Sequence, residues 1–223
     1  MFFAMRIFFV TILFIIVFLL IKRSKIVKKE IFNIFLIVLL TVTLFVSYLM
    51  TPIENLFLTF SSVEKAFTYV STQSTKDILC VVDGKETSLV VAANDEENIL
   101  KIFPLTENGW KLSTGLETAL IMQQHYGNVS IHIYRYKESN DYYIQIFNVY
   151  GEAIELSDNQ DSIFHSVERP NSSVRQPVHY YYTCVQNIKD DYIIYIDGQE
   201  VNLGNQGTVA QSGDGAIRGR YCD

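Results

Sequence analysis

The side chains best suited to binding or catalysis in this 223-residue chain are tyrosines and histidines. Eleven of the fourteen tyrosines fall between Tyr126 and Tyr195. In "SIHIYRY", strand alternation puts His132, Tyr134 and Tyr136 on one face and isoleucines on the other. Aromatic rings often carry the main binding energy of an interface. We therefore predict these three residues as a binding face for sugar rings or a partner peptide, although tyrosine also suits a half-buried strand without a ligand.

Metal and catalytic chemistry have little support in the sequence. The three cysteines form no C-x-x-C pair, and no two of the four histidines are three or four residues apart. Metal sites usually include such a close pair. The chain also lacks G-x-S-x-G, H-E-x-x-H, P-loop and G-x-G-x-x-G motifs. We predict no catalytic residue, no metal site and no cofactor.

Cys80 and Cys184 both lie in predicted strands. A small, buried, apolar residue is ordinary at such positions. A disulfide between the two is the alternative if the domain lies outside the cytoplasm. The sequence leaves both states of this pair open.

The elements that carry these side chains are predicted to be strands from Asp77 onward. "DILCVVDGKETSLVVAA" is two apolar runs around Asp83-Gly84, and "DDYIIYIDGQEVNL" repeats the pattern around Asp197-Gly198. Both dipeptides suit hairpin turns. Strands joined by short turns predict an antiparallel sheet, which can keep one face in water.

Three other stretches complete the pattern of elements. "SSVEKAFTYV" predicts a short amphipathic helix, with Ser61 and Glu64 as a capping box. Residues 111–126 fit either a helix or a strand that pairs with "VSIHIYRY", and the strand is preferred. Residues 157–177 are polar and contain proline, which predicts an exposed excursion.

Two apolar segments, residues 2–21 and 31–50, flank the basic stretch "IKRSKIVKKE". A bilayer core of ~30 Å takes about 20 helical residues, and neither segment has a polar face. Residues 1–50 carry a net charge of +5, whereas residues 51–223 carry −11. Cytoplasmic loops collect Lys and Arg. The sequence therefore predicts a transmembrane hairpin with a cytoplasmic turn at 22–30 and both termini outside; a cleaved signal peptide is the alternative.

The predicted fold class is an N-terminal transmembrane helical hairpin followed by a mainly antiparallel β (α+β) extracytoplasmic domain with one short helix. The domain spans residues 51–203, and residues 204–223 predict a disordered tail. The apolar segments contain no glycine, which favours an anchor over a conduit. The negative charge of the domain argues against nucleic acid.

Four short motifs carry a resemblance: "PIENLF", "SVEKAF", "NGWKL" and "NDYYI". Their order resembles that in a set of uncharacterised small membrane-anchored proteins of Gram-positive bacteria. The resemblance covers about residues 51–150. It implies a location in the cell envelope and no activity.

These observations predict a multi-pass plasma-membrane protein that is an extracytoplasmic interaction or sensing module of the bacterial cell envelope. Its predicted partners are the membrane lipid bilayer and an envelope protein or glycan. The alternative is an envelope enzyme with an unrecognised site. A pocket with convergent acid, base and nucleophile groups would favour the enzyme, whereas an aromatic sheet face or a bare strand edge would favour the module.

Overall fold

The computed structural model describes the chain in separate stretches. Near the N-terminus, the described residues are all helical: Thr11, Ile12, Ile15, Ile16, Leu19, Ile37, Val38, Thr41 and Val42. The other described residues fall in six ranges: 52–71, 77–93, 98–113, 117–148, 153–169 and 178–204. These ranges are mostly antiparallel β-sheet with one short α-helix.

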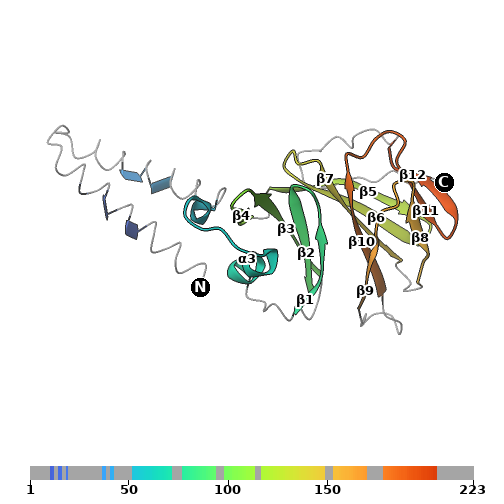
Figure 1. Cartoon of the computed structure of the whole chain (residues 1–223), viewed down its shortest axis with the longest axis horizontal. Coiled ribbons are helices and arrows are strands. Elements are labelled where there is room, and N and C mark those ends of the chain that lie inside the picture. The colour runs from blue at the N-terminus through green and yellow to red at the C-terminus, as the bar shows by residue number, and fades with distance from the viewer. Residues whose placement is uncertain are drawn as a thin grey trace.

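A helix and three sheets stack in series across the described domain, with α3 on one side and the smallest sheet on the other (Figure 1). The first sheet has the order β1-β2-β3-β4, with β1 (Ile78–Asp83), β2 (Thr87–Ala93), β3 (Asn98–Thr106) and β4 (Gly109–Trp110). A short 3-10 helix, η1 (Ile53–Leu56), and the α-helix α3 (Val63–Val70) precede it.

The second sheet contains the predicted binding strand and has the order β5-β6-β7-β10-β9. Its strands are β5 (Thr118–Tyr126), β6 (Val129–Tyr136), β7 (Asp141–Asn148), β9 (His165–Arg169) and β10 (Val178–Gln186). The third sheet has the order β12-β11-β8, with β8 (Leu156–Asp158), β11 (Ile193–Ile196) and β12 (Gln199–Asn202). All the strand pairs are antiparallel.

Within the described ranges, three apolar cores lie between the layers. The helix α3 buries Val63, Ala66 and Phe67 against Val90 and Phe103 of the first sheet. The first and second sheets enclose a core made of Val82, Leu89, Val91, Ile102, Tyr136, Tyr143, Val167 and Tyr182. The second and third sheets enclose the largest core, which contains Ile131, Ile133, Ile144, Ile146, Tyr192 and Ile194. The second sheet is therefore covered on both faces, by the first sheet on its tyrosine-rich face and by the third sheet on its isoleucine-rich face.

The helix α3 begins one residue later than the sequence predicts. Its N-cap is Ser62, whose side chain accepts a hydrogen bond from Lys65 N at 3.4 Å. The Ser62 backbone is extended (φ −150°, ψ 157°), as an N-cap requires. Ser61 instead accepts a hydrogen bond from Lys65 Nζ at 2.9 Å. The prediction of Ser61 as the cap is therefore wrong.

Residues 111–126 are predicted to form either a helix or a strand, and the second part of this stretch, Thr118–Tyr126, forms the strand β5. β5 pairs with β6, and Tyr126 lies opposite Val129 across the turn. Gly127 in this turn has φ +55°, a conformation that glycine adopts without cost.

The turn predicted at Asp197-Gly198 is also confirmed, since both residues have positive φ (+49° and +77°) between β11 and β12. The predicted excursion at 157–177 is wrong in part, because it contains most of β8 and all of β9.

The carboxylate of Asp141 fastens the first sheet to the second. It lies fully buried at the start of β7 and accepts hydrogen bonds from Lys85 N (2.9 Å), Glu86 N (2.7 Å) and Thr87 N (2.7 Å). The Thr87 hydroxyl donates to it at 2.8 Å, and Gln186 Nε2 donates from β10. The turn that joins β1 to β2 is thus held on a strand more than fifty residues away, and this contact ties the first sheet to the start of β7.

The predicted fold class needs a correction, because its transmembrane hairpin is not shown. Among the described residues, no helix is long and apolar enough to cross a membrane. The α-helix α3 has 8 residues, or ~12 Å at 1.5 Å per residue, whereas a span needs ~30 Å. The multi-pass description and the plasma-membrane localisation with both termini outside are corrected on the same finding.

Several predicted segments lie outside the described residues. Most of the predicted spans 2–21 and 31–50 do so, as does the basic turn at 22–30. The predicted tail does so as well, apart from Gly204. The division of the chain into these segments and a domain at 51–203 therefore stays a prediction.

Candidate functional site

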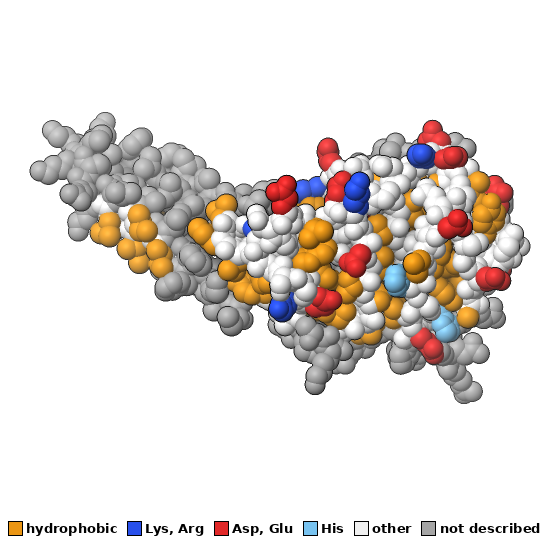
Figure 2. All heavy atoms as spheres, viewed as in Figure 1, with side chains coloured by type: hydrophobic (Ala, Val, Ile, Leu, Met, Phe, Trp, Pro, Cys, Tyr) orange, Lys and Arg blue, Asp and Glu red, His pale blue; other side chains and the backbone are white. Residues whose placement is uncertain are grey.

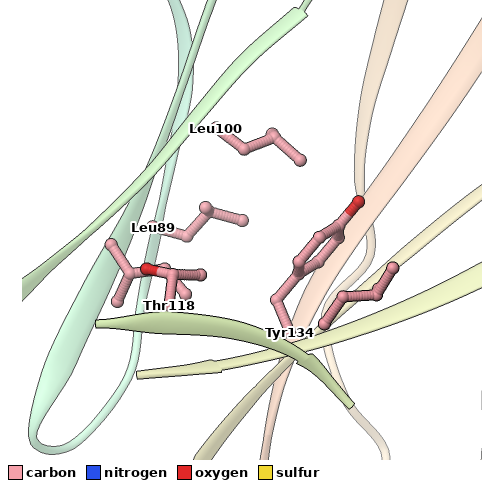
Figure 3. A pocket seen from close by; sticks show the side chains of 6 residues that line it. Leu89, Leu100, Thr118 and Tyr134 are labelled. Atoms are coloured by element: carbon pink, nitrogen blue, oxygen red, sulfur yellow. The ribbon is translucent and has the colours of Figure 1, made fainter. Parts of the chain in front are cut away.

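A pocket of about 210 Å³ lies between the first and second sheets. We call it the inter-sheet pocket and define it by its six lining residues: Leu89, Leu100, Ile102, Thr118, Leu120 and Tyr134. Figure 3 shows Leu89 and Leu100 extending from the first sheet toward the Tyr134 ring on the second. Strand pairing puts Leu120 directly opposite Tyr134, so one rung of the β5–β6 ladder forms a wall of the pocket.

A chain of hydrogen bonds runs from Tyr134 across the second sheet to the first. The Tyr134 hydroxyl donates to Gln145 Oε1 at 3.1 Å, and Gln145 Nε2 donates to the Tyr182 hydroxyl at 3.1 Å. Asn98 Nδ2, from β3, donates to the same hydroxyl at 3.1 Å. His132, Gln145 and Tyr182 are neighbours in register on β6, β7 and β10. The Tyr134 hydroxyl is thus connected, through Gln145 and Tyr182, to polar groups on β7, β10 and β3.

His132 lies at the other end of this chain. Because the Tyr134 proton goes to Gln145, the Tyr134 oxygen accepts from His132 Nδ1 at 3.2 Å. His132 Nε2 is then an unprotonated acceptor, and it has no partner among the described residues. Burial lowers the pKa of His132, so its imidazole is neutral near pH 7. Burial also raises the pKa of Tyr134 to about 12, so this phenol stays protonated.

Tyr136, the third predicted residue, lies under the first sheet rather than at the pocket. It is 9% exposed and belongs to the core between the two sheets. Its hydroxyl donates to Glu117 Oε2 at 3.0 Å, and Glu117 also forms an ion pair with Lys137 at 2.6 Å. Burial, with the nearby Glu117 carboxylate, raises the pKa of Tyr136. The structure therefore puts the three predicted residues on one face but joins only His132 and Tyr134 in one site.

Two aromatic residues that the sequence reasoning missed extend this site. The His132 ring contacts Tyr134 at 6.2 Å and Phe147 at 5.3 Å between ring centroids, and Phe147 contacts Tyr180 at 5.3 Å. Tyr134, His132, Phe147 and Tyr180 thus form a row across β6, β7 and β10. Each is half-buried. Alternation within β7 and β10 identifies the residues on each face, but only the strand register shows which of them are neighbours.

Cys80 and Cys184 are free thiols in the structure, so no disulfide joins them. Both are half-buried beside the core between the first and second sheets. Burial raises the pKa of Cys80 to about 11. Burial, with the nearby Asp141 charge, raises the pKa of Cys184 to about 12. Both thiols are therefore protonated and weakly nucleophilic near pH 7.

We expect both thiols to react slowly in the native protein. In a full-length Cys222→Ser variant at pH 8, labelling by 5,5′-dithiobis(2-nitrobenzoate) should be roughly tenfold or more slower than in the same chain unfolded in guanidinium. The reason is the small thiolate fraction that follows from the raised pKa values of Cys80 and Cys184. Equal rates in the two states would contradict the burial, and no reaction after unfolding would reveal a disulfide.

The acidic charge of the domain does not gather into a metal site. Figure 2 shows acidic side chains spread over the visible face rather than collected in one cluster. Within the described ranges, no group of three or more His, Cys, Asp or Glu side chains is placed to hold a metal ion. The charged side chains therefore offer no competing candidate to the inter-sheet pocket in this part of the chain.

The fold and the pocket define a layered, antiparallel β protein with an uncharged site between two of its sheets. Comparison of the chain with protein-family models, with curated proteins and with solved structures finds no match. The resemblance over about residues 51–150 stays a prediction.

Proposed function

We propose that this domain is a non-catalytic binding module, and that the inter-sheet pocket is its site for a small molecule. The observation that carries the proposal is the composition of the pocket. Four aliphatic side chains, the aromatic ring of Tyr134 and Thr118 line a space of about 210 Å³. Ligand sites in proteins are commonly concave and apolar, with a few well-placed polar groups.

The chemistry of the walls supports binding rather than catalysis. The lining residues include no carboxylate, imidazole or thiol. Tyr134 is the one lining group that titrates, and its pKa of about 12 makes it a poor base near pH 7. An enzyme active site would need acid, base and nucleophile groups that converge on the pocket. The lining residues instead suit binding, so we favour a binding module over the enzyme.

The rigidity of the walls also supports the proposal. A site binds best when its groups are held in place before the ligand arrives. Tyr134 is held by Gln145 and His132, and the opposite wall belongs to the sheet that the Asp141 carboxylate fastens. Binding at this pocket would therefore need little reordering of the protein.

Toluene is a suitable probe for this proposal, because it is apolar and the size of one ring. We expect toluene, titrated into the full-length chain, to shift the methyl NMR signals of Leu89, Leu100, Ile102 and Leu120 in a saturable way. The methyl signals of Ile131 and Ile133 should not move, since these residues lie in the core on the other side of the second sheet. A Leu100→Phe variant should bind toluene more weakly, because the larger ring occupies part of the pocket.

Two results would contradict the proposal. The first is no saturable change at the four pocket residues. The second is an equal change in all three cores, which would mean that toluene partitions into apolar regions generally. The melting temperature of Leu100→Phe must also be measured, so that weaker binding is not confused with unfolding.

A further inference from the structure

The strand β5 forms an open edge of the second sheet. It pairs with β6 alone among the described strands, and no described residue makes a backbone hydrogen bond to its other side. We infer that this edge is a docking site for an extended segment of another protein, which adds to the sheet as a further strand. The inference goes beyond the small-molecule site proposed above and does not depend on it.

The register of β5 with β6 shows which backbone groups face outward. In an antiparallel pair, residues that exchange hydrogen bonds alternate with residues whose N–H and C=O groups point away from the partner. Lys137 N donates to Glu117 O at 2.7 Å, which sets this alternation at the start of the pair. Four residues of β5 then have an outward backbone: Thr118, Leu120, Gln123 and His125. Their donors and acceptors are the ones that an added strand would pair.

The strand β5 differs from the other edge strands of the described sheets in length and in charge. It has nine residues, whereas the longest of the others, β1, has six. Proteins commonly protect such edges with short strands, charged side chains or proline. The sequence of β5, TALIMQQHY, contains no Asp, Glu, Lys, Arg or Pro. The register shifts once, between Leu120 and Met122, and is regular from there to Tyr126.

The side chains of β5 favour apolar neighbours on an added strand. Leu120 and Met122 are half-buried. Leu120 lies opposite Tyr134, and Met122 packs against the core between the second and third sheets. Opposite residues on adjacent strands have side chains about 5 Å apart. Apolar or β-branched residues on the added strand would therefore cover more of Leu120 and Met122.

The charge of the domain favours another protein over a second copy of this chain. Residues 51–223 carry 12 basic and 23 acidic side chains, a net charge of −11. Two copies would repel each other, whereas a neutral or basic segment would not be repelled. The strand β5 carries no basic Lys or Arg that would offset the repulsion. We therefore assign the edge to a neutral or basic segment of a different protein.

The probe for this inference is the synthetic peptide acetyl-Lys-Thr-Val-Thr-Leu-Thr-Val-Thr-Lys-amide, titrated into the full-length chain. Binding at the edge should slow hydrogen exchange at the outward amides of Gln123 and His125 by about tenfold or more at saturation. The amide of Gln124 already faces β6 and should not change. A control peptide with proline in place of both valines cannot form a continuous strand, so it should protect neither outward amide.

Gln123→Pro is the matching variant of the chain. Proline removes the outward N–H of residue 123 and leaves the hydrogen bonds to β6 in place. We expect the peptide to bind about tenfold more weakly, because one main-chain donor is lost and the proline ring stands in the way of the added strand. Gln123→Thr keeps the N–H and should bind the peptide as the unmodified chain does. Thermal unfolding checks that both variants keep the native fold.

Three results would overturn the inference. The first is no saturable protection of Gln123 and His125, a measurement on the unmodified chain that does not depend on whether Gln123→Pro folds. The second is peptide binding that Gln123→Pro leaves unchanged. The third is self-association in sedimentation velocity with the same amides protected in the absence of peptide, which would make a second copy the occupant. Toluene binding is measured separately, so the proposed function can fail while the edge site stands, and the reverse.

Discussion

Replacement of Asp141 by alanine is expected to lower the free energy of unfolding by about 4 kcal/mol. The Asp141 carboxylate is fully buried and accepts five hydrogen bonds. Three come from backbone N–H groups, one from the Thr87 hydroxyl and one from the side-chain amide of Gln186. Alanine would leave these donors buried without an acceptor. Each such donor costs about 1–3 kcal/mol, although relaxation of the turn lets water reach some of them. Urea denaturation of the full-length chain measures the loss.

Two further variants show what the Asp141 result means. Asp141→Asn keeps the size of the side chain but replaces one acceptor oxygen with an NH₂ group, which faces other donors. It should therefore recover only part of the lost stability. Asp190→Ala is the control, because Asp190 is exposed and should change stability by less than about 0.5 kcal/mol. A loss below about 1 kcal/mol in Asp141→Ala would mean that the contact between the sheets does not depend on this carboxylate.

Replacement of Gly84 by alanine should be nearly as damaging, at about 3 kcal/mol. A Cβ atom at Gly84 would lie 2.5 Å from Asp141 Cγ and Oδ2 and 2.8 Å from the Tyr143 hydroxyl oxygen. Neither group can retreat easily, because Asp141 is held by its five hydrogen bonds and Tyr143 is fully buried. The cause of this loss is space rather than backbone conformation.

Gly127→Ala measures the cost of backbone conformation without a steric clash. Gly127 has φ +55°, and nothing lies within 4 Å of the Cβ position. Alanine there should cost only about 1 kcal/mol, the price of a left-handed backbone. If Gly127→Ala proves worse than Gly84→Ala, the close approach of the first sheet to Asp141 is not rigid. The double variant Gly84→Ala with Asp141→Ala should lose less than the sum of the two single losses, because removal of the carboxylate relieves part of the clash.

Much of the local structure could be predicted because strands and hairpin turns leave short-range patterns. Alternation separates Ile131 and Ile133 from Tyr134 and Tyr136, and the structure puts the two pairs in different cores. Asp197-Gly198 predicts its turn because both residues tolerate positive φ. The one-residue error at the N-cap of α3 has a local cause as well, since two adjacent serines can both cap and the backbone of Ser62 decides.

The pocket and the Asp141 contact could not be predicted, because both depend on residues that are distant in the sequence. The lining residues come from β2, β3, β5 and β6, and their meeting depends on how two sheets stack. No local pattern shows that Asp141 receives the turn at Lys85–Thr87. The transmembrane prediction is corrected because no helix in the described part of the chain is long and apolar enough to cross a membrane, and most of the residues on which that prediction rested lie outside this part.

The strand order of the second sheet also determines a sequence of events during folding. β5, β6 and β7 follow one another along the chain and can form as successive hairpins. β9 pairs with no described strand except β10, its antiparallel neighbour along the chain, so these two strands can form a second local unit. This unit joins the sheet only where β10 pairs with β7, a contact between strands that β8 and β9 separate along the chain. Until that contact forms, the edge of β7 is bare, and this interval is when an incompletely folded copy would be most exposed to pairing with another chain.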